Sequence, residues 1–244
     1  MPQVYLPRRM DRAFARLAAN SREKALLLFN NPAYVSFWDD FFGDALDARW
    51  SATSGTGTEV VGITAGIGGT MTLTTGANAD DSAGVGAGLH WKGDNGIYMI
   101  VRAKIDSVAT AKFEIGLSDA MVSRDTGAVA VKATPTFTAT DWAGFVFDTT
   151  DDTLVTFTSN GGTSDGNADG PAAAADAYSI YEILVNGPTA TTGDFASGYI
   201  NGNLIGSGNI NGATAVGPWL YVETNTTATR TLTVDYVGCI SPRV

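Results

Sequence analysis

Apolar and polar residues alternate with a period of two along most of the chain from about Val35, which is typical of β-strands with one buried face. The pattern is clearest in residues 98–105, 178–185 and 231–237. The apolar positions are Met99, Val101, Ala103 and Ile105 in the first segment, and Leu232, Val234 and Tyr236 in the last. These segments are predicted to be strands of an all-β protein.

Asn-Gly pairs separate many of the strand-like segments. They stand at 95–96, 160–161, 186–187, 201–202 and 211–212. Both residue types tolerate positive φ, so each pair favours a hairpin turn. The pattern contains about twelve to fifteen candidate strands, at the spacing expected of a sandwich. Residues 158–177, which are polar and rich in Gly, Asp and Ala, predict an extended surface loop.

The first part of the chain follows a helical period instead. In residues 8–29, Met10, Phe14, Leu17 and Ala18 form an apolar stripe with arginines beside it, and Pro32 ends the predicted helix. We therefore expect a basic helical arm over residues 1–35 and a sandwich over residues 36–244. One helix of this size cannot bury its own stripe, so it must dock on the sandwich, on a neighbouring subunit or on another protein.

Charge separates the same two parts. The 244 residues carry a net charge of −10, but residues 1–30 have six basic and two acidic side chains, so the arm is +4 and the remainder −14. An acidic body repels nucleic acid and anionic membranes. We expect neither as a partner, and the arm carries no recognised DNA-binding motif. No apolar run approaches the roughly 18 residues of a membrane span, and no secretory signal is expected.

Residues 37–50 read Phe-Trp-Asp-Asp-Phe-Phe-Gly-Asp-Ala-Leu-Asp-Ala-Arg-Trp, which resembles the opening of concanavalin A-like lectin/glucanase jelly rolls. Residues 198–205 look like a hairpin of laminin G-like sandwiches. Residues 219–224 and 231–237 are similar to the family's closing strands. The resemblance covers roughly residues 36–240 and implies a concanavalin A-like jelly-roll β-sandwich with a short N-terminal α-helical arm.

The Thr/Gly/Ala-rich, Cys-poor composition behind a basic leader is similar to sandwiches of bacteriophage virion proteins. This resemblance implies a non-enzymatic structural protein of the virion, assembled in the host cytoplasm. Its role would be that of a capsid decoration or accessory subunit, with capsid or other virion proteins as partners. The anchoring residues would be Arg8, Arg9, Arg12, Phe14, Arg16 and Leu17. A homo-oligomer is also expected, because the apolar stripe needs a cover.

Catalytic motifs of this fold family are missing. Laminarinase-type glucanases use Glu-x-Asp-x-x-Glu on one strand, and this chain has no such motif. Glu114 and Asp119 would lie on opposite faces of a strand, so Glu114 is interpreted as a surface or edge residue. The single histidine, His90, lacks a nucleophile elbow and is interpreted as structural. A glycoside hydrolase or lyase with an unfamiliar site is the weakest alternative.

Residues 165–176 match a calcium-loop pattern, with Asp165, Asn167, Asp169 and Asp176 as candidate ligands. The pattern ends in Asp where Glu is usual, and a strand follows in place of a helix. Asp and Gly also gather in loops simply because they form turns. Calcium is therefore an option, and no other cofactor is predicted.

The main alternative function is a carbohydrate-binding, lectin-like module of a fibre or adhesin, assisted by calcium if the loop binds it. Exposed aromatic side chains would be needed, and Trp91, Trp142 and Trp219 are the candidates. Their strand-like context favours burial instead. Cys239, the only cysteine, is expected to be a small buried hydrophobe. Acidic clusters at 78–81 and 148–152 are expected at hairpin tips.

Overall fold

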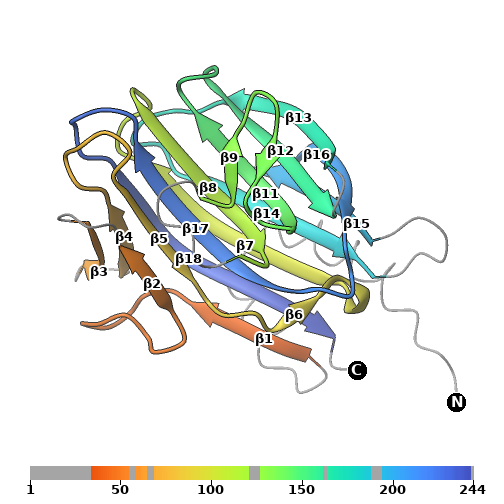
Figure 1. The fold of residues 1–244 in the computed structure, drawn as a ribbon. Coiled ribbons are helices and arrows are strands. Elements are labelled where there is room, and N and C mark those ends of the chain that lie inside the picture. The colour runs from red at the N-terminus through yellow and green to blue at the C-terminus, as the bar shows by residue number, and fades with distance from the viewer. Residues whose placement is uncertain are drawn as a thin grey trace, which may run out of the picture.

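Two large antiparallel sheets pack face to face in the computed structural model (Figure 1), which describes residues 34–54, 59–64, 69–120, 127–161, 164–187 and 194–242. The first sheet orders its strands β16 (Asn203–Ile210), β15 (Asp194–Ile200), β14 (Ser179–Asn186), β7 (Ile97–Ile105), β18 (Thr231–Pro242), β4 (Thr70–Thr74) and β3 (Val60–Thr64), and β1 (Tyr34–Asp39) also pairs with β18.

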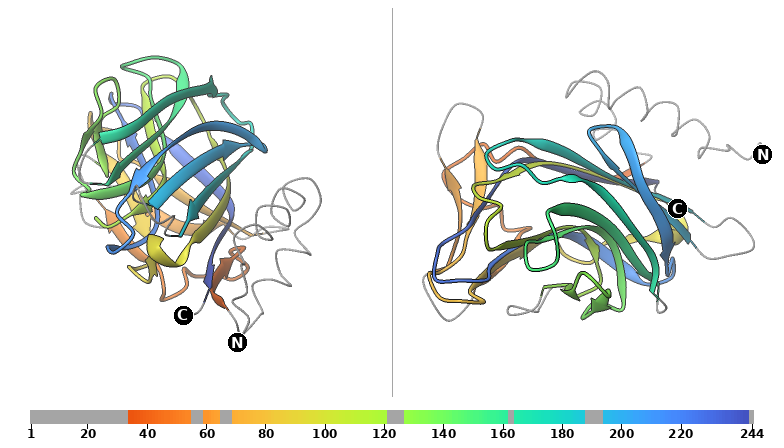
Figure 2. Two further views of the ribbon diagram at one scale, coloured as in Figure 1. Left: turned by 90° about the vertical axis from the view of Figure 1, so that its right-hand side faces the viewer. Right: turned by 90° about the horizontal axis from the view of Figure 1, so that it is seen from above.

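The second sheet orders its strands β13 (Ser164–Ala172), β12 (Leu154–Gly161), β11 (Asp141–Asp148), β8 (Ala111–Ser118), β17 (Ala215–Thr224), β5 (Ser82–Gly86) and β2 (Ser51–Ser54), and β6 (Trp91–Lys92) also pairs with β17. A 3-10 turn, η1 (Gly93–Asn95), follows β6. A small hairpin of β9 (Val129–Val131) and β10 (Thr136–Phe137) lies outside the two layers (Figure 2, right).

The core lies between the two sheets and follows the alternation in the sequence. Alternate residues of β7, from Met99 to Ile105, face Phe113, Ile115 and Leu117 of β8 across one continuous apolar cluster. Aromatic rings fill its centre, and Phe113 stacks on Phe147 with ring centroids 5.3 Å apart. Such burial of alternate apolar side chains is the main stabilising contribution to a sandwich.

The all-β jelly-roll architecture is confirmed. Strands predicted over 98–105 and 178–185 appear as β7 and β14, and Asn201–Gly202 forms a hairpin turn with φ values of 51° and 78°. The predicted helical arm lies outside the described residues apart from its last two positions, where β1 begins at Tyr34. No helix among the described residues is long and apolar enough to cross a membrane.

The predicted apolar face of residues 231–237 is wrong at one position. The register of β18 against β7 shifts between Val234 and Tyr236, so the strand bulges at Asp235. A bulge inserts one extra residue and reverses the faces that follow. Tyr236 consequently leaves the core and stacks on Trp38, with ring centroids 5.2 Å apart, while Val237 becomes buried.

The long loop predicted over residues 158–177 is also wrong, because most of it belongs to strands β12 and β13. β13 is an edge strand that packs against β16 of the other sheet. A Cβ atom added at Gly166 would lie 3.0 Å from the Ser207 carbonyl oxygen, and one at Gly170 would lie 3.0 Å from Ile205 Cγ2. The glycines that suggested a loop therefore permit close packing of two strands.

Candidate functional site, a buried carboxylate cluster beneath a hairpin

The outer face of the second sheet carries a polar cluster that the β9–β10 hairpin covers. Along β8, Lys112 and Glu114 point away from the core-facing residues Phe113 and Ile115, as the period of a strand requires. The hairpin region contributes Ala128, Val129 and Ala139 to a second apolar cluster, together with Trp142, Val146, Trp219 and Tyr221 from the sheet. The cluster is thus enclosed between sheet and hairpin.

Glu114 is fully buried, and both of its carboxylate oxygens accept hydrogen bonds. The backbone N–H of Ala128 donates to Oε2 at 2.7 Å, and that of Val129 donates to Oε1 at 3.0 Å. The indole Nε1–H of Trp219 donates to Oε2 at 2.9 Å. A buried charge is tolerated only with such partners. Glu114 therefore fastens the start of the hairpin to the centre of the sheet.

Gly127 makes this contact sterically feasible. Its φ of +64° lies in the left-handed region, and an added Cβ atom would lie 2.2 Å from Glu114 Oε1. A side chain would be strained in this conformation, and its Cβ atom would have no space beside the carboxylate. The two amides that follow Gly127 then point together at the carboxylate, in the manner of a backbone anion-binding turn.

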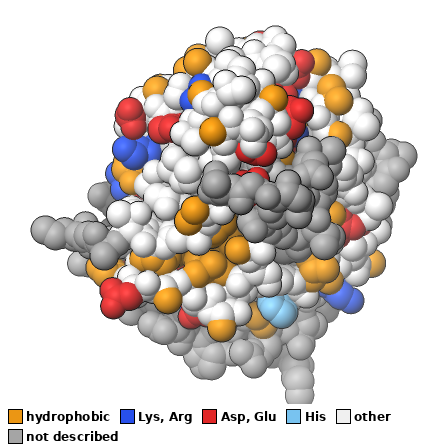
Figure 3. Space-filling model, turned by 60° about the vertical axis from the view of Figure 1, so that its left-hand side comes forward, with side chains coloured by type: hydrophobic (Ala, Val, Ile, Leu, Met, Phe, Trp, Pro, Cys, Tyr) orange, Lys and Arg blue, Asp and Glu red, His pale blue; other side chains and the backbone are white. Residues whose placement is uncertain are grey.

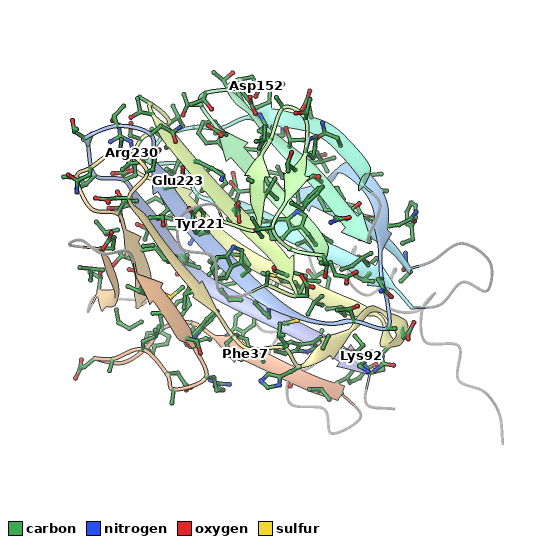
Figure 4. The ribbon with its side chains drawn as sticks, viewed as in Figure 1. Phe37, Lys92, Asp152, Tyr221, Glu223 and Arg230 are labelled. Carbon is green, nitrogen blue, oxygen red and sulfur yellow. The ribbon has the colours of Figure 1, made fainter. Side chains whose placement is uncertain are left out.

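Lys112 links Glu114 to a second buried carboxylate. Its Nζ lies 3.8 Å from Glu114 Oε1 and 3.5 Å from Glu223 Oε2. The Tyr221 hydroxyl donates to the same Glu223 oxygen at 2.6 Å. Lys112 pairs directly with Glu223 across β8 and β17, and Glu114 pairs with Tyr221. Figure 4 shows Tyr221 and Glu223 following one another along β17.

Burial dominates the electrostatics of this cluster. Loss of water raises the pKa of Glu114, although Lys112, the two backbone amides and Trp219 act in the opposite direction. Desolvation likewise raises the pKa of Glu223 against the effects of Lys112 and Tyr221. Burial, and then the charge of Glu223, raise the pKa of Tyr221, which therefore stays protonated and acts as a donor.

Trp142 completes the floor beneath the hairpin. Its indole lies over Gly116 and Gly144, which face each other on β8 and β11. Added Cβ atoms would lie 2.5 Å from Trp142 ring atoms at both positions. The ring is completely buried, and its Nε1 has no hydrogen-bond partner among the described residues. This tryptophan fills space and has no exposed surface that could contact an external ligand.

Two further contacts tie the hairpin down. Lys132 Nζ lies 2.5 Å from Asp152 Oδ1, and the hydrogen bond from Lys132 lowers the pKa of that carboxyl. Asn160 Nδ2 donates to the Ala139 carbonyl oxygen at 3.1 Å. With Glu114, these contacts come from three different strands or turns of the second sheet. The hairpin is thus attached at its start, near its middle and at its end.

The interpretation of Glu114 as a surface or edge residue is wrong. Its strand β8 lies in the middle of the second sheet, and residues 127–140 cover its outer face. The sequence did not predict the roles of Lys112, Tyr221 and Glu223 in this cluster. One signal was present in the sequences of β8 and β17, which are apolar on both faces apart from a few charged residues. Charged residues in such segments indicate that they are buried with partners.

The candidate calcium ligands do not form a loop. Residues 164–172 are extended as β13, where residues four apart lie about 13 Å from each other. Asp169 accepts a hydrogen bond from Thr156, and Asp176 lies 3.4 Å from Lys104 Nζ in the segment beyond the strand. No group of three or more potential metal-ligating His, Cys, Asp or Glu side chains occurs within the described part of the chain. Binding of calcium by Asp165, Asn167, Asp169 and Asp176 stays a prediction without structural support.

Other expectations have mixed outcomes. The arm residues Arg8, Arg9, Arg12, Phe14, Arg16 and Leu17 lie outside the described residues. Trp91, Trp142 and Trp219 are buried as expected, and so is Cys239, whose pKa burial raises well above the ordinary value. Asp151 and Asp152 lie in the turn between β11 and β12, at a hairpin tip as predicted, whereas Asp148 is buried at the end of β11. Residues 78–81 connect β4 of the first sheet to β5 of the second, so the hairpin tip predicted there is wrong.

Comparisons with solved structures agree with this architecture. A protein of unknown function from Shewanella oneidensis MR-1 is 12% identical with a TM-score of 0.57, over 91% of this chain and 95% of that one. The Emp47p carbohydrate recognition domain is 6% identical with a TM-score of 0.58, over 85% and 95%. SCLam, a non-specific endo-β-1,3(4)-glucanase from family GH16, is 13% identical with a TM-score of 0.59, over 87% and 93%. No protein-family model and no curated protein sequence matches the chain.

The fold is therefore that of the concanavalin A-like lectin and glucanase jelly rolls. That architecture serves carbohydrate recognition domains and glucanases alike, so the fold alone does not choose between binding and catalysis.

Proposed function

We propose that this chain is a non-enzymatic structural subunit of a bacteriophage virion, in which the sandwich is displayed and residues 1–35 attach it to the particle. The single observation that carries the non-enzymatic part is the use of Glu114. A retaining glycosidase needs two carboxyl groups that reach the substrate, one as nucleophile and one as acid/base. Here both carboxylate oxygens of Glu114 accept hydrogen bonds from Trp219 and from the backbone of the hairpin, so this carboxyl group does not reach a substrate.

The exposed surface supports a role in which the sandwich stays apart from its neighbours. On the face drawn in Figure 3, charged side chains are scattered among neutral ones, and neither sign forms a continuous patch. The net charge of −10 keeps such subunits mutually repulsive. The basic arm, in contrast, suits an acidic or apolar groove on a capsid or other virion protein.

Co-sedimentation tests the attachment. Full-length protein and its Arg9→Glu/Arg12→Glu variant would be mixed with particles of the same source that had been stripped of this protein. We expect the variant to bind about tenfold more weakly or worse, since two favourable charge contacts become repulsive. The matched control is Arg49→Glu/Lys92→Glu, which changes the net charge equally on exposed parts of the sandwich. Equal loss in both variants would contradict attachment through the arm.

A carbohydrate-binding module is the second candidate, and the structural likeness to a carbohydrate recognition domain favours it. Binding of the full chain to an array of glycans, measured with calcium and with a chelator, tests this function. Retention on glycans without sedimentation with particles would replace the virion proposal. Turnover of a polysaccharide, lost on substitution of a carboxylate, would contradict the non-enzymatic assignment.

A further inference from the structure

A cavity lies between the two sheets at one end of the sandwich, on the far side of the second sheet from the hairpin. It has a volume of about 140 Å³. Ile105 and Ile200 from the first sheet and Phe113 and Val155 from the second line its interior. The cavity is thus a local gap at the edge of the main core.

A segment rich in alanine borders the cavity. Residues 173–177 cross from β13 in one sheet to β14 in the other, over the end of the sandwich. The Ala173 N–H donates to the Thr153 carbonyl oxygen at 2.9 Å, and the Asp176 N–H donates to the Ile105 carbonyl oxygen at 2.8 Å. Both sheets therefore hold this segment in place.

Small side chains leave the space unfilled. Ala173 is half-buried and packs against the core, whereas the neighbouring lining residues Ala172, Ala174 and Ala177 are exposed. A larger aliphatic side chain at position 173 would occupy the gap. Because Ala172, Ala174 and Ala177 are exposed, the gap opens at the surface and a small molecule can enter it.

One wall is polar but uncharged. Ser179, Tyr181 and Asn201 line it, and Tyr181 is 7% exposed. Asn201 is fixed by the Ile180 N–H, which donates to its Oδ1 at 2.9 Å, and its Nδ2 lies 3.5 Å from Ser179 Oγ. No charged side chain lines the cavity. A charged ligand would lose its hydration without compensation, and a sugar would leave most of its hydroxyl groups unpaired.

We propose that this cavity binds a small, uncharged, mainly apolar molecule, with an aromatic ring and a single hydroxyl group as the best match. Apolar cavities of about 150 Å³ in another protein bind benzene, so the volume suffices for one ring. The ring would contact Phe113 and Val155, and its hydroxyl would face Tyr181 and Ser179. The proposal is independent of the virion function.

Phenol is the probe. Full-length protein would be titrated with phenol, and amide resonances followed by NMR. We expect shifts confined to residues around Ile105, Ala173 and Tyr181. Ala173→Leu fills the cavity and should weaken binding at least about tenfold. The matched control is Ala175→Leu, at an exposed neighbour that does not line the cavity, and it should bind as the original chain does.

A second variant covers the case in which Ala173→Leu fails to fold. Tyr181→Phe keeps the ring and removes the hydroxyl, so it should weaken phenol several-fold and leave benzene unchanged. Three results would overturn the proposal: no shifts at the cavity with either probe, binding to Ala173→Leu equal to that of the original chain, or equal effects of Tyr181→Phe on phenol and benzene.

Discussion

Glu114 holds an ionisable group at a position with no exposed surface, and its neighbours determine whether this stabilises the protein. Three N–H donors and the Lys112 ammonium compensate for the lost hydration. A neutral amide of the same shape would turn an N–H₂ group toward at least one of these donors. It would also remove the carboxylate charge that lies 3.8 Å from Lys112 Nζ.

Glu114→Gln should lower the free energy of unfolding by about 2–4 kcal/mol, because a buried charged partner is lost and donors are left facing a donor. Urea unfolding at neutral pH measures the change. Asp94→Asn, an exposed carboxylate in η1, is the control and should shift the free energy by less than about 0.5 kcal/mol. Similar effects of the two substitutions would show that Glu114 does not fasten the hairpin.

The same cluster predicts a dependence of stability on pH. Burial raises the pKa of Glu114 and Glu223, so the folded chain binds their protons more tightly than the unfolded chain does. Their contribution is fully present below the ordinary glutamate pKa of about 4.3 and is lost as the pH rises through the raised values. Glu223→Gln should therefore flatten this fall by up to about 1.4 kcal/mol per pH unit.

Urea unfolding of both proteins across the range from about pH 4 to pH 8 measures the two slopes. The difference between them isolates Glu223 from Glu182 and Asp141, whose pKa values burial also raises. Parallel curves would mean that Glu223 titrates alike in the folded and unfolded states.

At the scale of elements, close contact between strands depends on glycine pairs beneath aromatic rings. Gly116 and Gly144 receive Trp142 on the second sheet, and Gly198 and Gly206 receive Phe157 between the sheets. In both cases the glycines face each other on neighbouring strands, so two missing side chains make one flat recess. The ring then fills a space that the strands themselves define.

Gly116→Ala should destabilise the protein by about 1–3 kcal/mol, because its Cβ atom would meet Trp142 at 2.5 Å and the Ala143 carbonyl oxygen at 2.8 Å. Gly62→Ala is the matched control in strand β3, where the nearest atom, Val60 Cγ1, is 3.7 Å away. The control should be neutral or slightly stabilising, since alanine restricts the unfolded chain. Thermal unfolding of both variants compares them directly, and equal losses would contradict the packing argument.

The local sequence pattern predicted those strands that have a paired strand on each side and the core on one face. β7 alternates between buried and half-buried residues from Met99 to Ile105, because it lies between two strands with the core on one face. The pattern failed where a distant segment sets the environment. In the sequence, Gly166 and Gly170 are typical of a turn, but in the structure they allow β16 to pack closely on β13. Glu114 is on the outer face of its sheet, but residues 127–140 cover that face and bury it. The bulge at Asp235 has no signal in the alternation that precedes it.

For the whole molecule, stability should not depend on a metal ion. Asp169 accepts a hydrogen bond from Thr156, and Asp176 forms an ion pair with Lys104, so both carboxylates already have partners without a cation. The extended strand β13 also separates the candidate ligands along its length. We expect the same melting temperature in millimolar calcium and in excess chelator. Specific binding to the folded state at a concentration 100-fold above Kd would add about 2.7 kcal/mol. A melting temperature several degrees higher in calcium than in chelator would instead support calcium binding by these residues.

The position of β18 constrains the order in which the protein can be made. It is the last of the described strands in chain order, yet it pairs with β7 on one side and with β4 and β1 on the other. During synthesis the edges of those strands stay open until residue 242 has left the ribosome. Open edges are where chains aggregate. β1, β4 and β7 are therefore synthesised before the strand that joins the two parts of the first sheet, and factors that shield nascent chains should affect the yield of this protein more than its final stability.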